Sequence, residues 1–94
     1  MNQRVIERRL RDVLAKLERA REELALIEEQ LMSLVDDADD ARIRSLVAET
    51  PLADREWQLA NRHAEAMARS RETVRHRVAE LEHSRDELLG KLVV

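Results

Sequence analysis

Apolar residues recur at alternating steps of three and four through the first third of the chain. The residues that keep this spacing are Leu10, Val13, Leu17, Ala20, Leu24, Ile27, Leu31 and Leu34. Such spacing places them along one side of a helix and is typical of a coiled coil. The pattern stops at the acidic run Asp36–Asp40. We therefore predict a first helix from about residue 3 to residue 35.

A second apolar pattern follows the acidic run. Its members are Ile43, Leu46, Ala53, Trp57, Ala60, Ala64, Met67, Val74, Val78, Leu81, Leu88 and Leu92. Clustered negative charge opposes the dipole at a helix C-terminus, so we expect a turn at 36–40 and a short helix at 41–49. Thr50-Pro51 is a second start signal, since threonine caps helices and proline suits the first helical position. A last helix is expected from about 51 to 90.

These elements predict an all-α fold, an antiparallel coiled-coil helical hairpin of long, short and long helices that forms a single domain over residues 1–94. A narrow seam buries little surface, so we expect a homodimer or small oligomer. Two arginines, Arg71 and Arg85, fall within the second apolar pattern. Two antiparallel registers remain open. One pairs residues whose numbers add to 91 and sets Arg71 opposite Ala20, whereas the other pairs numbers that add to 77 and sets Trp57 opposite Ala20.

Composition narrows the classes of function. Among the 94 residues, 39% are charged and 1% are aromatic, cysteine is absent, and the net charge of −3 comes from well-mixed signs. A mixed surface creates no strong field toward nucleic acid, so nucleic-acid binding is not expected. The sequence has no apolar stretch of membrane-spanning length and no apolar leader. We expect a cytoplasmic protein without disulfides or membrane contact.

Candidate chemistry is sparse. His76, Glu80 and His83 share one helix face and carry zinc-binding groups, but the apolar phase puts all three on the solvent side, where we expect them to stay metal-free. The serines have no histidine and carboxylate at suitable offsets, and a single glycine cannot build a phosphate-binding loop. We therefore expect neither enzymatic activity nor a cofactor.

The acidic run supports one resemblance. Asp36, Asp39 and Ala41 form the arrangement Asp, two residues, Asp, one residue, Ala at the predicted end of the hairpin. This arrangement resembles the tip motif of the DksA-type transcription factors. In that family a coiled-coil hairpin enters the secondary channel of RNA polymerase, and its acidic tip acts near the catalytic magnesium. The resemblance implies RNA polymerase as a partner, although the family's cysteine zinc finger is absent from this sequence.

Together these patterns favour a non-enzymatic protein–protein interaction module or scaffold. The expected partners are a second copy of the chain and an unidentified protein. The alternative is a transcription regulator that docks on RNA polymerase. The contact residues are expected near the predicted turn, and the candidates are Asp36, Asp39, Asp40, Ala41, Ile43, Leu46 and Val47.

Overall fold

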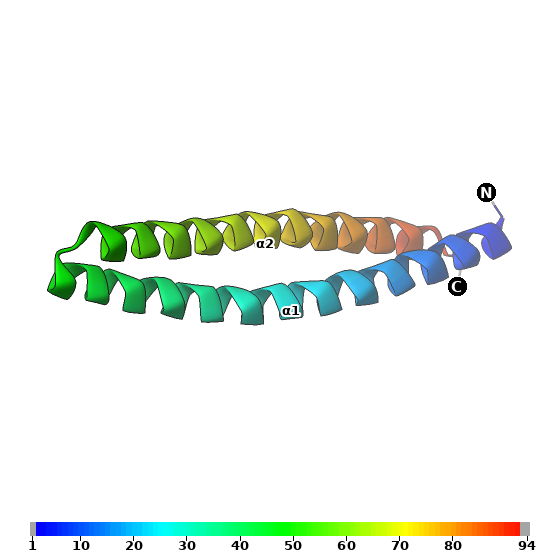
Figure 1. The fold of residues 1–94 in the computed structure, drawn as a ribbon. Coiled ribbons are helices and arrows are strands. Elements are labelled where there is room, and N and C mark those ends of the chain that lie inside the picture. Colours follow the sequence, from blue (N-terminus) through cyan, green and yellow to red (C-terminus); the bar gives the residue numbers. More distant parts are fainter. Residues whose placement is uncertain (1, 93–94) are drawn as a thin grey trace. The chain divides into compact units, whose positions relative to one another are not determined.

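The computed structural model describes residues 2–92, and these form two long α-helices. Helix α1 spans Gln3–Ala48 and helix α2 spans Pro51–Lys91, joined by a connection of two residues (Figure 1). The all-α class and the two-helix hairpin are confirmed. The prediction of three helices is wrong, because α1 continues through the acidic run and through the segment expected as a separate short helix.

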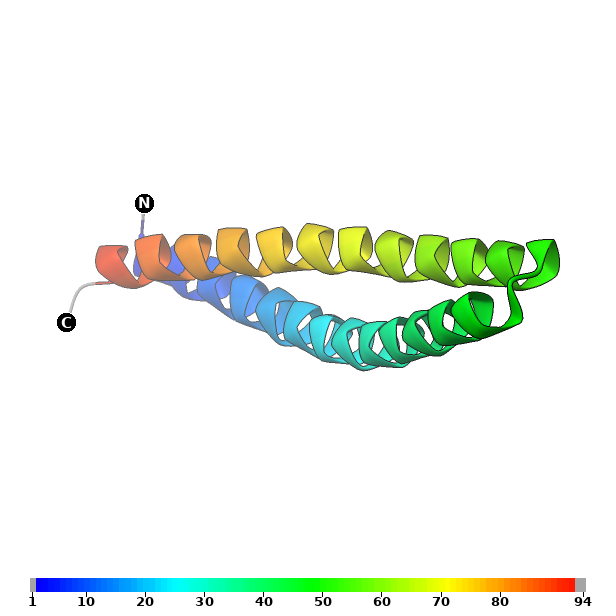
Figure 2. The same cartoon turned by 90° about the vertical axis from the view of Figure 1, so that its left-hand side faces the viewer.

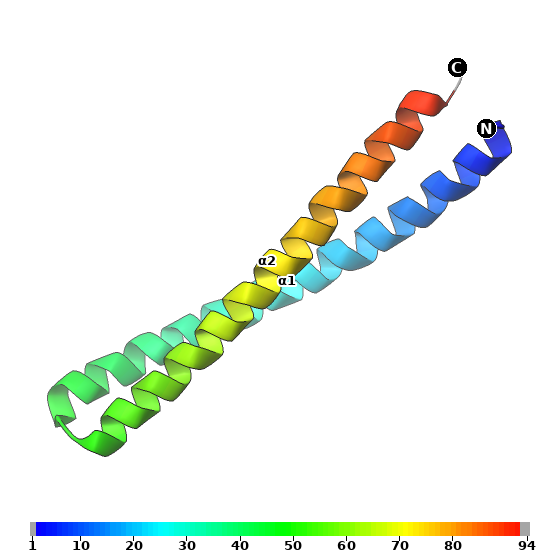
Figure 3. The same ribbon diagram turned by 90° about the horizontal axis from the view of Figure 1, so that it is seen from above.

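The chain divides into two compact units. Unit 1 joins the described residues up to Leu24 to those from Thr73 onward, and unit 2 is Ala25–Glu72. In unit 2, the end of α1 and the start of α2 are joined directly, so the chain reverses its direction at residues 49–50 (Figure 2). In unit 1, the N-terminal segment of α1, in blue, and the C-terminal segment of α2, in orange, run in opposite directions (Figure 3).

The core of unit 1 follows the predicted apolar spacing. Its buried side chains are Ile6, Leu17, Ala20, Val74, Val78 and Leu88. Two ion pairs flank this core: Arg21 Nη2 lies 3.1 Å from Glu82 Oε2, and Arg77 Nη1 lies 2.9 Å from Glu23 Oε2. These side chains are about half exposed, so each pair contributes only about 0–1 kcal/mol to stability. The pairs do report which residues of the two segments lie side by side.

The core of unit 2 is built mainly from small side chains. Its buried residues are Leu31, Ala38, Ala41, Ser45, Ala53 and Ala64. On α1 these residues, with half-buried Leu34, continue the spacing of three and four straight through the acidic run. The apolar stripe of α1 is therefore unbroken from Ile6 to Ser45, which explains why the helix does not end at residue 35.

The aspartates of the run do not break α1 because Asp36, Asp37, Asp39 and Asp40 are all exposed to solvent. Aspartate costs a helix at most about 0.7 kcal/mol per residue relative to alanine. The run also lies within the helix and not at its C-terminus, so the unfavourable end of the helix dipole is elsewhere. A solvated acidic face of α1 replaces the predicted turn.

Ile43 and Leu46 do not begin a second buried stripe. They are 60% and 67% exposed, while their smaller neighbours Ala41 and Ser45 are buried. The stripe of α2, in contrast, is as predicted from Ala53 onward, and Arg71 and Arg85 occupy half-buried positions within it.

Both predicted registers are wrong. Across the helices the structure pairs Ser45 with Asp54, Glu23 with Arg77 and Arg21 with Glu82. The numbers of the first two pairs add to 99 and 100, which centres them on a turn at Glu49-Thr50, and those of the third add to 103, which centres it two residues later. They fit neither a turn within the acidic run nor one a few residues after it.

Candidate functional site

The connection between the helices is short and closely defined. Glu49 ends α1 in the left-handed conformation, with φ of 53°, and its N–H donates to the Ser45 carbonyl at 3.0 Å. The Thr50 hydroxyl then accepts a hydrogen bond from the Ala53 N–H at 3.2 Å and caps α2. A left-handed residue after one helix and a hydroxyl cap before the next satisfy backbone groups that helix ends otherwise leave unpaired.

A polar contact ties the two helices together beside this connection. The buried Ser45 hydroxyl of α1 donates a hydrogen bond to the Asp54 carboxylate in the first turn of α2. A carboxylate in the first turn of a helix is also favoured by the helix dipole. Capping and this contact together fix the end of unit 2, so side chains on its outside are held by an ordered scaffold.

Large apolar side chains are exposed around this fixed end. Val47 is 80% exposed, Leu52 is 61% exposed and Ile43 is 60% exposed. They border a pocket of about 440 Å³, and we call its lining residues the tip surface. The members of the tip surface are Ile43, Arg44, Val47, Ala48, Thr50, Leu52, Ala53 and Glu56.

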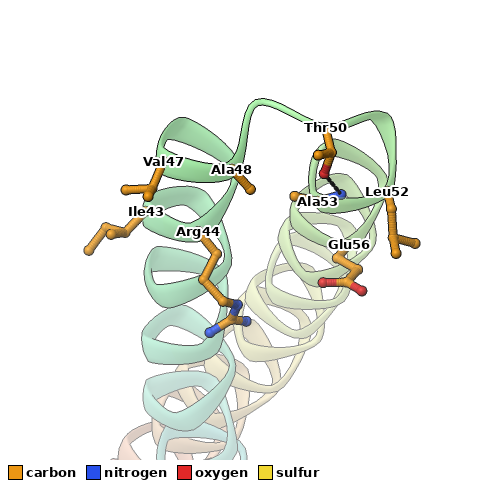
Figure 4. Close-up of a pocket in the computed structure, with 8 residues that line it drawn as sticks. All are labelled: Ile43, Arg44, Val47, Ala48, Thr50, Leu52, Ala53 and Glu56. Atoms are coloured by element: carbon orange, nitrogen blue, oxygen red, sulfur yellow. Dashed lines mark hydrogen bonds between the residues drawn. The ribbon is translucent and has the colours of Figure 1, made fainter.

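Two residues of opposite charge stand within the tip surface. Figure 4 shows Arg44 and Glu56 extending from the two helices toward the space between them, with Ile43 and Val47 on the outer side of α1 and Leu52 on the outer side of α2. Within residues 2–92, neither Arg44 nor Glu56 makes a hydrogen bond or ion pair. The tip surface thus combines apolar area with one available cation and one available anion.

The structure separates the residues that the sequence grouped as one site. Ile43 and Val47 lie together in the tip surface, whereas Leu46 is exposed but does not line its pocket. Ala41, another of the candidates, is buried in the core of unit 2 at 3% exposure, where its methyl group is covered by the chain's own helices.

The aspartates are not at the end of the hairpin. Asp36, Asp39 and Asp40 lie on the exposed face of α1, at least two helical turns before Ala48. Asp36 borders a different pocket of about 320 Å³, together with Leu31, Val35 and Arg71 among others. The residues that occupy the turn are Glu49 and Thr50, so the positional basis of the acidic-tip resemblance is absent.

Sequence reasoning missed Arg44, Leu52 and Glu56 as site residues. All three lie near a turn that the apolar pattern predicts elsewhere, so that pattern does not group them. The apolar spacing of α1 continues past the acidic run in the small residues Ala38, Ala41 and Ser45. Following this spacing places the turn next to the helix start signal Thr50-Pro51, and a turn there groups Arg44, Leu52 and Glu56.

The histidine face does not assemble a metal site. His76 Nε2 lies 2.9 Å from Glu80, whereas His83 Nε2 lies 3.1 Å from a different carboxylate, Glu87. In the part of the chain that the structure describes, no group of three or more histidine, aspartate or glutamate side chains is arranged to hold a metal ion. Nor, among those residues, is either helix apolar enough along its length to cross a membrane.

Comparisons of the chain with protein-family models, with curated proteins and with solved structures found no match.

Proposed function

We propose that this protein is a non-enzymatic protein-binding module, in which two helices paired as an antiparallel coiled coil present the tip surface to a protein partner. The observation that carries the proposal is the exposure of Ile43, Val47 and Leu52, at 60–80%, around one pocket on a fixed turn. Contiguous exposed apolar side chains bordered by polar residues are a common mark of protein-binding surfaces.

The chemistry of the pocket supports binding over catalysis. Its lining is mainly aliphatic, and its one hydroxyl, that of Thr50, already accepts the capping hydrogen bond from Ala53. Catalysis by a side-chain nucleophile needs a base within hydrogen-bond reach, and the lining residues offer no such pair. The exposed apolar side chains provide area that a partner would cover, and Arg44 and Glu56 between them provide charges that would orient it.

Site-specific photo-crosslinking in living cells tests the proposal. A photoreactive amino acid replaces Val47, which is 80% exposed and so tolerates the change without loss of the fold. The matched control carries the same amino acid at Glu29, an exposed position on the same helix outside the tip surface.

Irradiation is expected to attach the Val47 derivative to a polypeptide, either a second copy or another protein, and to leave the Glu29 derivative largely unattached. Equal labelling from both positions, or no product from Val47, would contradict a binding role for the tip surface.

A further inference from the structure

We propose that the occupant of the tip surface is a second copy of this chain, held by a two-fold contact in which Arg44 of each copy pairs with Glu56 of the other. This inference rests on the proposed function and names its partner. The contact would place the two charge pairs over the space between the helices and lay Val47 of each copy against Leu52 of the other on either side.

The arrangement of charge in the tip surface is self-complementary. A two-fold interface joins the same patch on both subunits, so each residue i that meets residue j is matched by j meeting i. Arg44 comes from α1 and Glu56 from α2, at opposite sides of the pocket (Figure 4). A two-fold rotation therefore brings each arginine to the other copy's glutamate. A partner with one strong sign of charge would satisfy one of the two residues and repel the other.

The absence of an ion pair between Arg44 and Glu56 within one chain also supports pairing with a second copy. In unit 1, Arg77 and Glu23 occupy matching flanks of the two helices and close an ion pair at 2.9 Å. Arg44 and Glu56 hold the equivalent flanking positions in unit 2, since each is twenty-one residues from its counterpart along its own helix. The unit 2 pair nevertheless stays open over an apolar pocket, which leaves both charges available to another molecule.

Further apolar area lies next to the tip surface on α2. Leu59 is 49% exposed, so a second copy seated on the tip surface can cover it as well. A standard interface takes about 800 Å² from each partner, which is more than the tip surface residues alone need to supply if such neighbours are covered too.

A charge-exchange experiment tests the inference. Two full-length variants are purified, one with Arg44→Glu and one with Glu56→Arg, and their association is measured by sedimentation equilibrium, alone and mixed. Each variant alone would place two like-charged pairs across the interface, so its Kd for self-association is expected to rise at least about tenfold. Mixing them creates two attractive pairs, and the Kd of the mixed dimer is expected to return to within about threefold of the wild-type value.

Matched controls use exposed residues outside the tip surface. The variants Glu29→Arg and Arg62→Glu reverse charges on the outer faces of the same two helices, and both should dimerise as the wild type does, alone and mixed. A separate variant, Val47→Ser, removes apolar area from the tip surface without reversing any charge. It should also weaken dimerisation about tenfold, while circular dichroism shows unchanged helix content.

Three results would overturn the inference. They are a wild-type chain that stays monomeric at high micromolar concentration, an Arg44→Glu variant that dimerises as tightly as the wild type, and a mixture that fails to recover dimers.

The photo-crosslinking result separates this inference from the proposed function. Products of about twice 11.0 kDa support both, products with other proteins alone support only the binding role, and no product contradicts both.

Discussion

The two leucines Leu31 and Leu46 provide a sharp test of which side of α1 is buried. Both lie on the same helix within unit 2 and carry the same side chain. Leu31 is 8% exposed, whereas Leu46 is 67% exposed. Replacing each by alanine removes three carbon atoms, so the difference between the two variants isolates the effect of burial.

The expected losses follow from these exposures. At about 0.8 kcal/mol for each buried CH₂ group, Leu31→Ala removes about 2 kcal/mol of transfer free energy, and a residual cavity can raise the loss to about 4 kcal/mol. Leu46 has only about a third of its surface covered, so Leu46→Ala should cost about 0.8 kcal/mol at most. The higher helix propensity of alanine returns a few tenths of a kcal/mol.

Urea unfolding followed by far-ultraviolet circular dichroism measures both losses, and the protein concentration is kept low so that self-association does not contribute. The free energy of unfolding should fall clearly for Leu31→Ala and barely for Leu46→Ala. Equal losses of about 2 kcal/mol or more would show that Leu46 belongs to the core, as the sequence pattern first indicated, and would refute the placement of the buried stripe.

Three further predictions concern stability and the acidic face. Arg71→Leu should raise the free energy of unfolding by about 1–2 kcal/mol, because the buried Nε of Arg71 has no hydrogen-bond partner among residues 2–92. The control Arg85→Leu should raise it less, since the Nε of Arg85 donates a hydrogen bond to Asp86 at 3.0 Å. Glu49→Gly should add about 0.5–1 kcal/mol by relieving the left-handed conformation, as thermal unfolding would show. Alanine at the three aspartates Asp36, Asp39 and Asp40 should raise helix content and leave the dimerisation Kd unchanged; loss of dimers would contradict the assignment of binding to the tip surface.

Much of the fold could be predicted from spacing alone. The buried stripe of α1 up to Leu34, the stripe of α2 from Ala53, the half-buried arginines and the start of α2 after Thr50 all follow the expected pattern. These features depend on local spacing and on capping chemistry, and both can be evaluated without knowing which residues of the two helices lie side by side.

The end of the hairpin could not be predicted in the same way. Near residue 40, two sets of residues on α1 could form the buried side of the helix. One set has the larger side chains of Ile43 and Leu46, and the other has the smaller ones of Ala38, Ala41 and Ser45. Hydrophobicity favours the larger set, but the helices bury the smaller one. The Ser45–Asp54 contact places Trp57, three residues further along α2, at the level of Ala41, four residues earlier on α1. We expect the small Ala41 to leave space for the indole at this level, a fit that hydrophobicity alone does not indicate.

Ion pairs between the two helices also indicate which residues of α1 lie opposite which residues of α2. A turn at Glu49-Thr50 sets Glu23 opposite Arg77 and brings Arg21 within reach of Glu82, the pairs that the structure shows. Each such pair is weak, so it does not determine the fold by itself. Two pairs that fall close to one register nevertheless indicate it. The same register places Arg44 and Glu56 within the tip surface, where no ion pair joins them.

The position of the turn decides which side chains form the tip surface. Trp57 is the only aromatic residue in the chain, so its indole protons can be identified in a nuclear magnetic resonance spectrum without ambiguity. A turn at Glu49-Thr50 predicts nuclear Overhauser contacts from this ring to the methyl group of Ala41. Contacts to Leu34 or Ala20 in their place would move the turn toward the acidic run and contradict the account.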